Sequence, residues 1–218
     1  MATLIKKAVA EFAGTAILVC VVVGSGIMGT NLSDDNGVAL IINALSTIFA
    51  LGLLILTLGP ISGAQFNPAV SLVQLFSRKQ SLGATVSLIV AQISGAISGA
   101  LLANVMFDLP AVQFSVHDRV STGMLIGEVI ATAGLVALIG TLSNREQDRY
   151  IPVAVAAWIG SASFFTSSTS FANPAVTIGR LFTDTFAGIA PASVLPYILA
   201  QLLGAAVGMA IAKGVANA

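Results

Sequence analysis

Long apolar stretches separated by short polar ones dominate the chain. A membrane-spanning helix needs about 20 mainly apolar residues, and six stretches approach or exceed that length: 8–28, 38–58, 82–107, 122–142, 151–165 and 193–212. The fifth is short, but it continues into a Ser/Thr-rich segment. This pattern predicts an all-α integral membrane fold with six transmembrane helices.

Two further apolar segments are too short to cross a membrane. Residues 68–76 and 174–182 hold nine residues each, roughly 13 Å of helix, whereas the hydrocarbon core is about 30 Å thick. Each begins inside an Asn-Pro-Ala turn, Asn67-Pro68-Ala69 or Asn173-Pro174-Ala175. Asparagine is a preferred N-cap residue and proline fits the first helical position. We therefore expect two half-helices that begin near the middle of the membrane.

The two halves of the chain carry the same features in the same order. An acid comes first, then Asn-Pro-Ala, then a glutamine followed by a Gly-x-x-x-Gly pair; the acids are Glu11 and Glu128, and the glutamines are Gln92 and Gln201. Each half holds three spans, so the second half enters the membrane upside down. Inverted repeats place the functional site at their interface. We expect one domain, 1–218, with inverted halves of about 1–108 and 121–218.

Composition narrows the function classes. The chain is 56% hydrophobic and 8% charged, with mean hydropathy +0.98, whereas soluble domains carry about a quarter charged residues. The net charge is zero, so nucleic acid is not an expected partner. A zinc site needs three or four ligands, and the lone histidine, His117, lies in a polar stretch. We expect no metal, no cofactor and no enzymatic activity, and the single cysteine, Cys20, allows no internal disulfide.

Basic residues predict the orientation of the spans. With a cytoplasmic N-terminus, most of them lie inside: Lys6, Lys7, Arg78, Lys79, Arg145, Arg149 and Lys213. Only Arg119 and Arg180 then lie outside, which fits the positive-inside rule. Residues 1–7 lack a small-residue cleavage site, so the first span is expected to be retained. Both termini are predicted to be cytoplasmic.

The paired turns suggest a passive path across the membrane. Half-helices inserted from opposite faces would meet with their positive N-terminal ends together, which repels cations and protons. The amide groups of Asn67 and Asn173 would face the lumen and donate hydrogen bonds to water or polyol oxygens. The predicted partners are therefore water and small neutral solutes, within a lipid bilayer.

Residues 59–70, Gly-Pro-Ile-Ser-Gly-Ala-Gln-Phe-Asn-Pro-Ala-Val, resemble the first signature of the aquaporin (major intrinsic protein) family. The resemblance covers essentially the whole chain. It implies six spans with two half-helices, and a homotetramer in which every subunit has its own pore. It also implies two constrictions, namely the paired Asn-Pro-Ala turns and an outer selectivity filter.

The sequence departs from the family pattern at the filter. The family usually has the filter arginine where this chain has Val176, and family spacing from the two Asn residues places the other filter positions at Thr47, Ser161 and Ser170. Such a filter has no aromatic ring, imidazole or guanidinium, so the pore is expected to be wide and permissive. Thr177 stands where the glycerol-conducting branch usually carries an acid, and Gln65 replaces a frequent histidine.

Loss of the filter arginine resembles a bacterial group of aquaporins associated with arsenic-resistance operons. That resemblance implies a protein of the bacterial cell membrane, with arsenous acid or methylated arsenicals as solutes beside water and glycerol-like polyols. Arsenous acid is uncharged at pH 7 and about the size of glycerol. An ordinary water and glycerol facilitator is the alternative. An ion-coupled secondary transporter and a structural membrane protein with a closed pore also remain open.

Three kinds of intramembrane polar residue need an interpretation. Glu11 and Glu128 could relay protons, but their symmetric placement favours a structural role, in which they accept hydrogen bonds from the loops that bear the half-helices. Gln92 and Gln201 are expected to form interhelical hydrogen bonds. Arg180 is expected to extend to the lipid headgroups rather than to line the pore.

Overall fold

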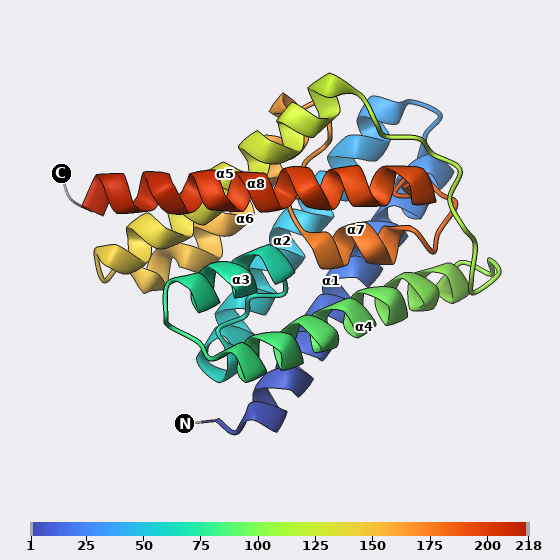
Figure 1. Cartoon of the computed structure of the whole chain (residues 1–218). Coiled ribbons are helices and arrows are strands. Elements are labelled where there is room, and N and C mark those ends of the chain that lie inside the picture. The colour runs from blue at the N-terminus through green and yellow to red at the C-terminus, as the bar shows by residue number, and fades with distance from the viewer. Residues whose placement is uncertain (1, 217–218) are drawn as a thin grey trace.

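The structure is a computed structural model that describes residues 2–216, and these residues form helices and connecting loops without strands (Figure 1). The helices are α1 (Leu4–Leu32), α2 (Asn36–Ser62), α3 (Pro68–Phe76), α4 (Leu82–Met106), α5 (Thr122–Asn144), α6 (Ile151–Phe165), α7 (Pro174–Arg180) and α8 (Pro191–Ala216), with a 3₁₀ turn, Asp148–Tyr150, before α6. The predicted all-α membrane fold is confirmed.

Five helices, α1, α2, α4, α5 and α8, are long and apolar enough to cross a membrane. The sixth, α6, holds 15 residues, about 22 Å of helix, and packs against α2 and α5. Most helices extend beyond their apolar windows because polar residues cap them. Asp35, for example, accepts hydrogen bonds from the backbone N–H groups of Gly37 and Val38 at the start of α2. The connection between the first two predicted spans, which end at 28 and begin at 38, therefore shortens to residues 33–35.

Close helix crossings occur at the two Gly-x-x-x-Gly pairs. A Cβ atom added to Gly95 or Gly99 of α4 would overlap the backbone carbonyl oxygens of α1, at Phe12 and Ala16. Gly204 and Gly208 of α8 lie in the same way against the backbone of α5. Only glycine allows backbones to approach this closely, so α1–α4 and α5–α8 form two matching pairs.

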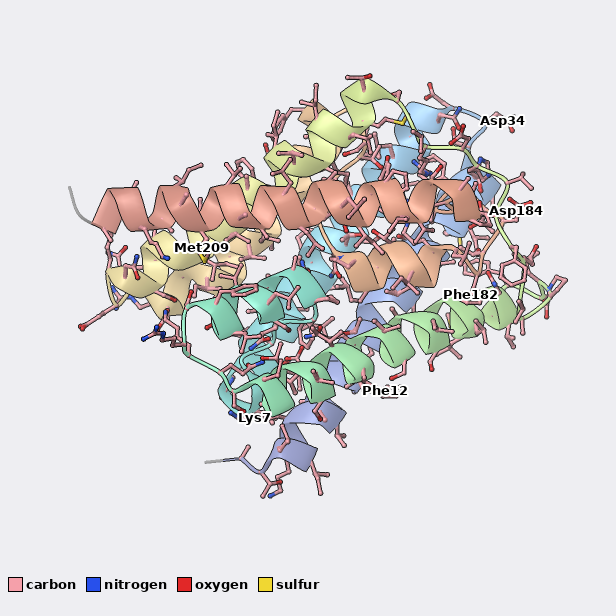
Figure 2. The ribbon with its side chains drawn as sticks, in the orientation of Figure 1. Lys7, Phe12, Asp34, Phe182, Asp184 and Met209 are labelled. Atoms are coloured by element: carbon pink, nitrogen blue, oxygen red, sulfur yellow. The ribbon has the colours of Figure 1, made fainter. Side chains whose placement is uncertain are left out.

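The two ends of the bundle differ in the segments they carry. We call the end where α1 begins and α8 ends the terminal end, and the opposite end the loop end. Figure 2 shows Lys7 and Met209 toward the terminal end, and Asp34, Phe182 and Asp184 toward the loop end. The short helices α3 and α7 lie between the long ones (Figure 1). They contact each other, so the Asn-Pro-Ala turns meet inside the bundle.

Candidate functional site: a cavity at two joined Asn-Pro-Ala turns

Each half-helix begins with a capped asparagine and a proline. The side-chain oxygen of Asn67 accepts a hydrogen bond from Ala69 N (2.9 Å), and that of Asn173 accepts one from Ala175 N (2.9 Å). Both asparagines have extended backbones, and the proline that follows takes the first helical position. The caps therefore fix both side chains at the N-termini of α3 and α7, where the positive ends of the helix dipoles lie.

The two turns are joined by reciprocal hydrogen bonds. The amide nitrogen of Asn67 donates to the carbonyl oxygen of Ala172, and that of Asn173 donates to the carbonyl oxygen of Phe66, both at 2.8 Å. An asparagine amide has two N–H donors. One donor of each asparagine is thus used to lock the turns together, and only the second remains for a solute, which modifies the expectation that both amide groups are free.

The residue before each asparagine has a left-handed backbone. Phe66 and Ala172 both have φ 48°, a conformation that is strained for residues other than glycine, by about 1–3 kcal/mol. A buried carboxylate holds each one. Glu11 accepts hydrogen bonds from Phe66 N and Gln65 N, at 2.6 and 2.9 Å. Glu128 accepts one from Ala172 N at 2.9 Å. The two carboxylates thereby hold in place the residues whose carbonyl oxygens join the turns.

The glutamines complete these two carboxylate networks. Gln92 donates to Glu11 at 2.8 Å, and Gln201 donates to Glu128 at 2.6 Å. Each glutamine amide nitrogen also donates to a hydroxyl of the adjacent half-helix, Ser71 for Gln92 and Thr177 for Gln201, both at 2.9 Å. All four side chains, Glu11, Glu128, Gln92 and Gln201, have no exposed surface. Thr177 therefore joins the scaffold.

One cavity of about 660 Å³ runs past the joined turns. Its lining includes Gln74, Asp148 and Arg149 toward the terminal end, Asn67 and Asn173 in the middle, and Asn43, Thr47 and Arg180 toward the loop end. Apolar side chains of α2 and α6, such as Leu51, Ile55 and Ile159, form the wall opposite. The cavity is therefore amphipathic, with polar groups from the turns on one side and hydrocarbon on the other.

Three of the four residues predicted for the filter line this cavity. Val176 and Ser170 are both 6% exposed, and the Ser170 hydroxyl has no hydrogen-bond partner within the described residues. Thr47 also lines the cavity and donates its hydroxyl proton to the carbonyl oxygen of Asn43 at 2.8 Å. Its oxygen remains available as an acceptor.

The placement of Ser161 in the filter is wrong. Ser161 is exposed on the outer side of α6, while Ile159 and Ser163 of the same helix line the cavity. Two residues correspond to about 200° of rotation around a helix, so Ser161 points away from the face that Ile159 and Ser163 share. Ser163 stands ten residues before Asn173, two fewer than the family spacing assumed.

Arg180 also differs from the prediction. Its side chain is 6% exposed and lines the cavity instead of extending to the headgroups. The guanidinium carbon lies 3.4 Å from the centre of the Phe171 ring, and Nε donates to the carbonyl oxygen of Ala187. A long side chain on a helix points back toward its N-terminus. That direction carries the guanidinium inward, toward the loop that bears Ser170.

Sequence reasoning missed Asn43 and Ser163, and it assigned Arg180 to the headgroups. Asn43 is four residues before Thr47 and so on the same helix face, a signal available from i, i+4 spacing. Its amide nitrogen donates to Val22 O (2.7 Å) and Ser25 Oγ (3.0 Å).

Gln65 lines the cavity and forms hydrogen bonds with Gln80 and Ser71. Cys20 and His117 are not among the lining residues.

Comparison with known proteins identifies the family. Residues 1–167 match the model of the major intrinsic protein family. The chain is also 43% identical to aquaglyceroporin AqpS of Rhizobium meliloti (strain 1021), over 96% of this chain and 90% of that protein. The chain belongs to the major intrinsic protein family. This family of aquaporins and aquaglyceroporins consists of membrane channels rather than enzymes.

Other relatives of this major intrinsic protein support the same placement. Aquaporin Z of Brucella melitensis biotype 1 is 31% identical, over 97% of this chain and 98% of that protein. The X-ray structure of the aquaglyceroporin from Plasmodium falciparum superposes with a TM-score of 0.76, covering 98% of this chain and 96% of the other, at 20% identity. That superposition supports the fold.

Proposed function

We propose that this protein is a passive channel with a wide outer constriction, which conducts water, glycerol-like polyols and arsenous acid or methylated arsenicals. The supporting observation is Val176, which lines the cavity where a long cationic side chain would otherwise project from the first turn of α7. Around it stand small hydroxyl side chains, Thr47, Ser163 and Ser170. These offer hydrogen bonds to a solute and occupy little of the cross-section.

The lining of the cavity suits compact solutes that are polar on one side. The hydroxyls of a polyol can donate hydrogen bonds to the turn carbonyl oxygens, and its oxygens can accept them from the second N–H groups of Asn67 and Asn173. The Ser170 hydroxyl can do either. Its carbon skeleton can lie against Leu51 and Ile159. Arsenous acid presents similar hydroxyl groups without a charge. The likeness to aquaglyceroporin AqpS and the resemblance of Val176 to the arsenic-operon group favour these larger solutes over water alone.

The assembly and orientation belong to the same proposal. Residues 1–108 and 121–218 would form one domain of inverted halves, and four copies would form a tetramer with a pore in each subunit. The terminal end carries Lys6, Lys7, Arg78, Lys79, Arg145, Arg149 and Lys213, so it faces the cytoplasm of a bacterial cell by the positive-inside rule. Glu11 and Glu128 serve as anchors of the turns, because each accepts several backbone and side-chain hydrogen bonds in the buried interior.

Comparison of water, glycerol and arsenous acid fluxes in proteoliposomes tests the proposal, with the wild type beside Val176→Arg. The added side chain narrows the constriction, so glycerol and arsenous acid fluxes should fall more than water flux, by about tenfold or more. Val176→Leu is the matched control for bulk without charge. Equal loss of all three fluxes, or no change, would remove Val176 from the constriction. Glycerol flux without arsenous acid flux in the wild type would favour the ordinary water and glycerol facilitator.

A further inference from the structure

We propose that Arg180 supplies the guanidinium of the outer constriction, where it excludes cations and donates hydrogen bonds to the oxygen atoms of passing solutes. This inference rests on the proposed channel function. Position 176, in the first turn of α7, carries no charge, and Arg180 follows four residues later on the same helix face. Both residues line the same cavity, the one that runs past the joined turns.

The direction of the side chain brings the charge back to the constriction. Four residues correspond to about 6 Å along the helix axis, so the backbone of Arg180 lies one turn closer to the loop end than that of Val176. The guanidinium nevertheless lies over the ring of Phe171, next to Ser170 in the chain. A small residue at 176 leaves space on this face for the arginine side chain to fold back along the helix.

The contacts of Arg180 leave its charge unneutralised. No carboxylate lies within 4.0 Å of the guanidinium in the described part of the chain. Its protein partners are the Ala187 carbonyl oxygen, at Nε, and the face of Phe171. Among the described residues, the terminal N–H groups have no protein acceptor. A cation that is 94% buried, as 6% exposure implies, is expensive without a carboxylate, and its free donors are available to solutes in the cavity.

A second arginine strengthens the positive potential at the loop end. The guanidinium carbon of Arg119 lies 5.3 Å from the centre of the same Phe171 ring. Its nitrogens donate to Gly188 O (2.7 Å) and Phe186 O (3.0 Å), and it is not among the lining residues of the cavity. Arg180 is thus the cation that a solute in the cavity would contact. Arg119 lies outside the cavity lining and adds to the positive electrostatic potential there.

Urea and guanidinium form a suitable pair of probes, because they are planar and similar in size but differ by one charge. The guanidinium ion used as a probe and the side chain of Arg180 both stay protonated over the pH range of the experiment. Two unit charges about 6 Å apart at an effective dielectric constant near 20 give a barrier that suppresses passage roughly 100-fold. Water in the cavity weakens this barrier, so we expect removal of the Arg180 charge to raise the guanidinium-to-urea permeability ratio by at least about tenfold.

The experiment measures both permeabilities in proteoliposomes for the wild type, Arg180→Gln and Arg180→Lys, with Arg145→Gln as the matched control at an exposed turn. The wild type, Arg180→Lys and the control should exclude guanidinium at pH 7, and Arg180→Gln should admit it. Because a lysine can lose its proton, raising the pH to about 10.5 should make Arg180→Lys admit guanidinium without any loss of urea flux. A purely structural role for Arg180 predicts no such pH profile.

The outcomes separate the two proposals. Urea flux in the wild type with an unchanged ratio in Arg180→Gln, and a flat pH profile in Arg180→Lys, would overturn the role of Arg180 and leave the channel standing. If Arg180→Gln does not fold, the pH profile of Arg180→Lys decides alone. Absence of urea and glycerol flux in the folded wild type would overturn the channel itself, and this inference with it.

Discussion

Replacing Glu11 with glutamine should destabilise the protein, because Glu11 accepts four hydrogen bonds in the buried interior. Its Oε1 atom accepts from Ser62 Oγ (2.6 Å) and Gln65 N (2.9 Å), and its Oε2 atom accepts from Phe66 N (2.6 Å) and Gln92 Nε2 (2.8 Å). Glutamine keeps one of these oxygens and replaces the other with an NH₂ group. If the NH₂ group takes the place of Oε1, Gln65 N faces a donor, whereas the Ser62 hydroxyl can turn and accept from it. If the NH₂ group takes the place of Oε2, Phe66 N and Gln92 Nε2 both face a donor.

The expected cost follows from these contacts. A hydrogen bond to a charged acceptor contributes about 1.5–3 kcal/mol. The less costly orientation of the amide loses one such bond, so Glu11→Gln should lower the free energy of unfolding by roughly 1.5–3 kcal/mol. In Glu128→Gln the new NH₂ group can take the place of Oε1, which accepts from Phe171 N (2.9 Å), so this change should cost about as much.

Thermal unfolding of purified variants in detergent, followed by size-exclusion chromatography, measures this cost. For a protein of this size 1 kcal/mol corresponds to about 2–4 °C, so Glu11→Gln and Glu128→Gln should each lower the melting temperature by roughly 3–12 °C. Unchanged melting temperatures for both would refute the anchoring role. A proton gradient that drives solute flux in the wild type but not in the variants would instead indicate that these two acids relay protons.

Three further predictions concern packing, register and the outer loop. Gly99→Ala should destabilise the α1–α4 crossing by about 1–3 kcal/mol or more, whereas Gly83→Ala, where an added Cβ meets nothing, should not; equal melting temperatures would contradict the crossing. Ser163→Cys should make glycerol flux sensitive to a thiol reagent, and Ser161→Cys should not. The reverse result would place Ser161, and not Ser163, at the pore. Hydrogen bonds from Ser193 Oγ and the Val120 N–H group lower the pKa of Asp118. Its stabilising contribution is therefore present above its unfolded pKa of about 3.9 and disappears as the pH falls through the lower folded pKa, so hydrogen exchange at Val120 should accelerate only below about pH 4; acceleration already at pH 6 would contradict this assignment.

Much of the scaffold could be predicted because single residues determine it locally. An asparagine cap followed by proline defines where a half-helix begins, and α3 spans the predicted residues 68–76. The acid, turn and glutamine recur in the same order, so hydrogen bonds among Glu11, Gln92 and the first turn follow from symmetry. Helix lengths were underestimated because polar capping residues extend helices beyond their apolar windows.

The outer constriction could not be predicted to the same degree. Counting residues back from Asn173 assumes a fixed loop length, and a loop two residues shorter turns Ser161 away from the cavity. The position of the Arg180 guanidinium depends on its side-chain conformation and on two partners, Phe171 and Ala187. Both partners belong to the loops on either side of α7, so the periodicity of that helix does not reveal them. Rules for snorkelling describe helices that face lipid, whereas α7 is enclosed by α1, α4 and α8.

Glycerol flux through wild-type proteoliposomes is the most direct test of the central claim, which is a passive path along the joined Asn-Pro-Ala turns. Glycerol-driven swelling should depend weakly on temperature, should be unaffected by a protonophore, and should be reduced about tenfold or more by Val176→Arg. Glycerol uptake that requires an ion gradient, or no flux from well-folded protein, would contradict it.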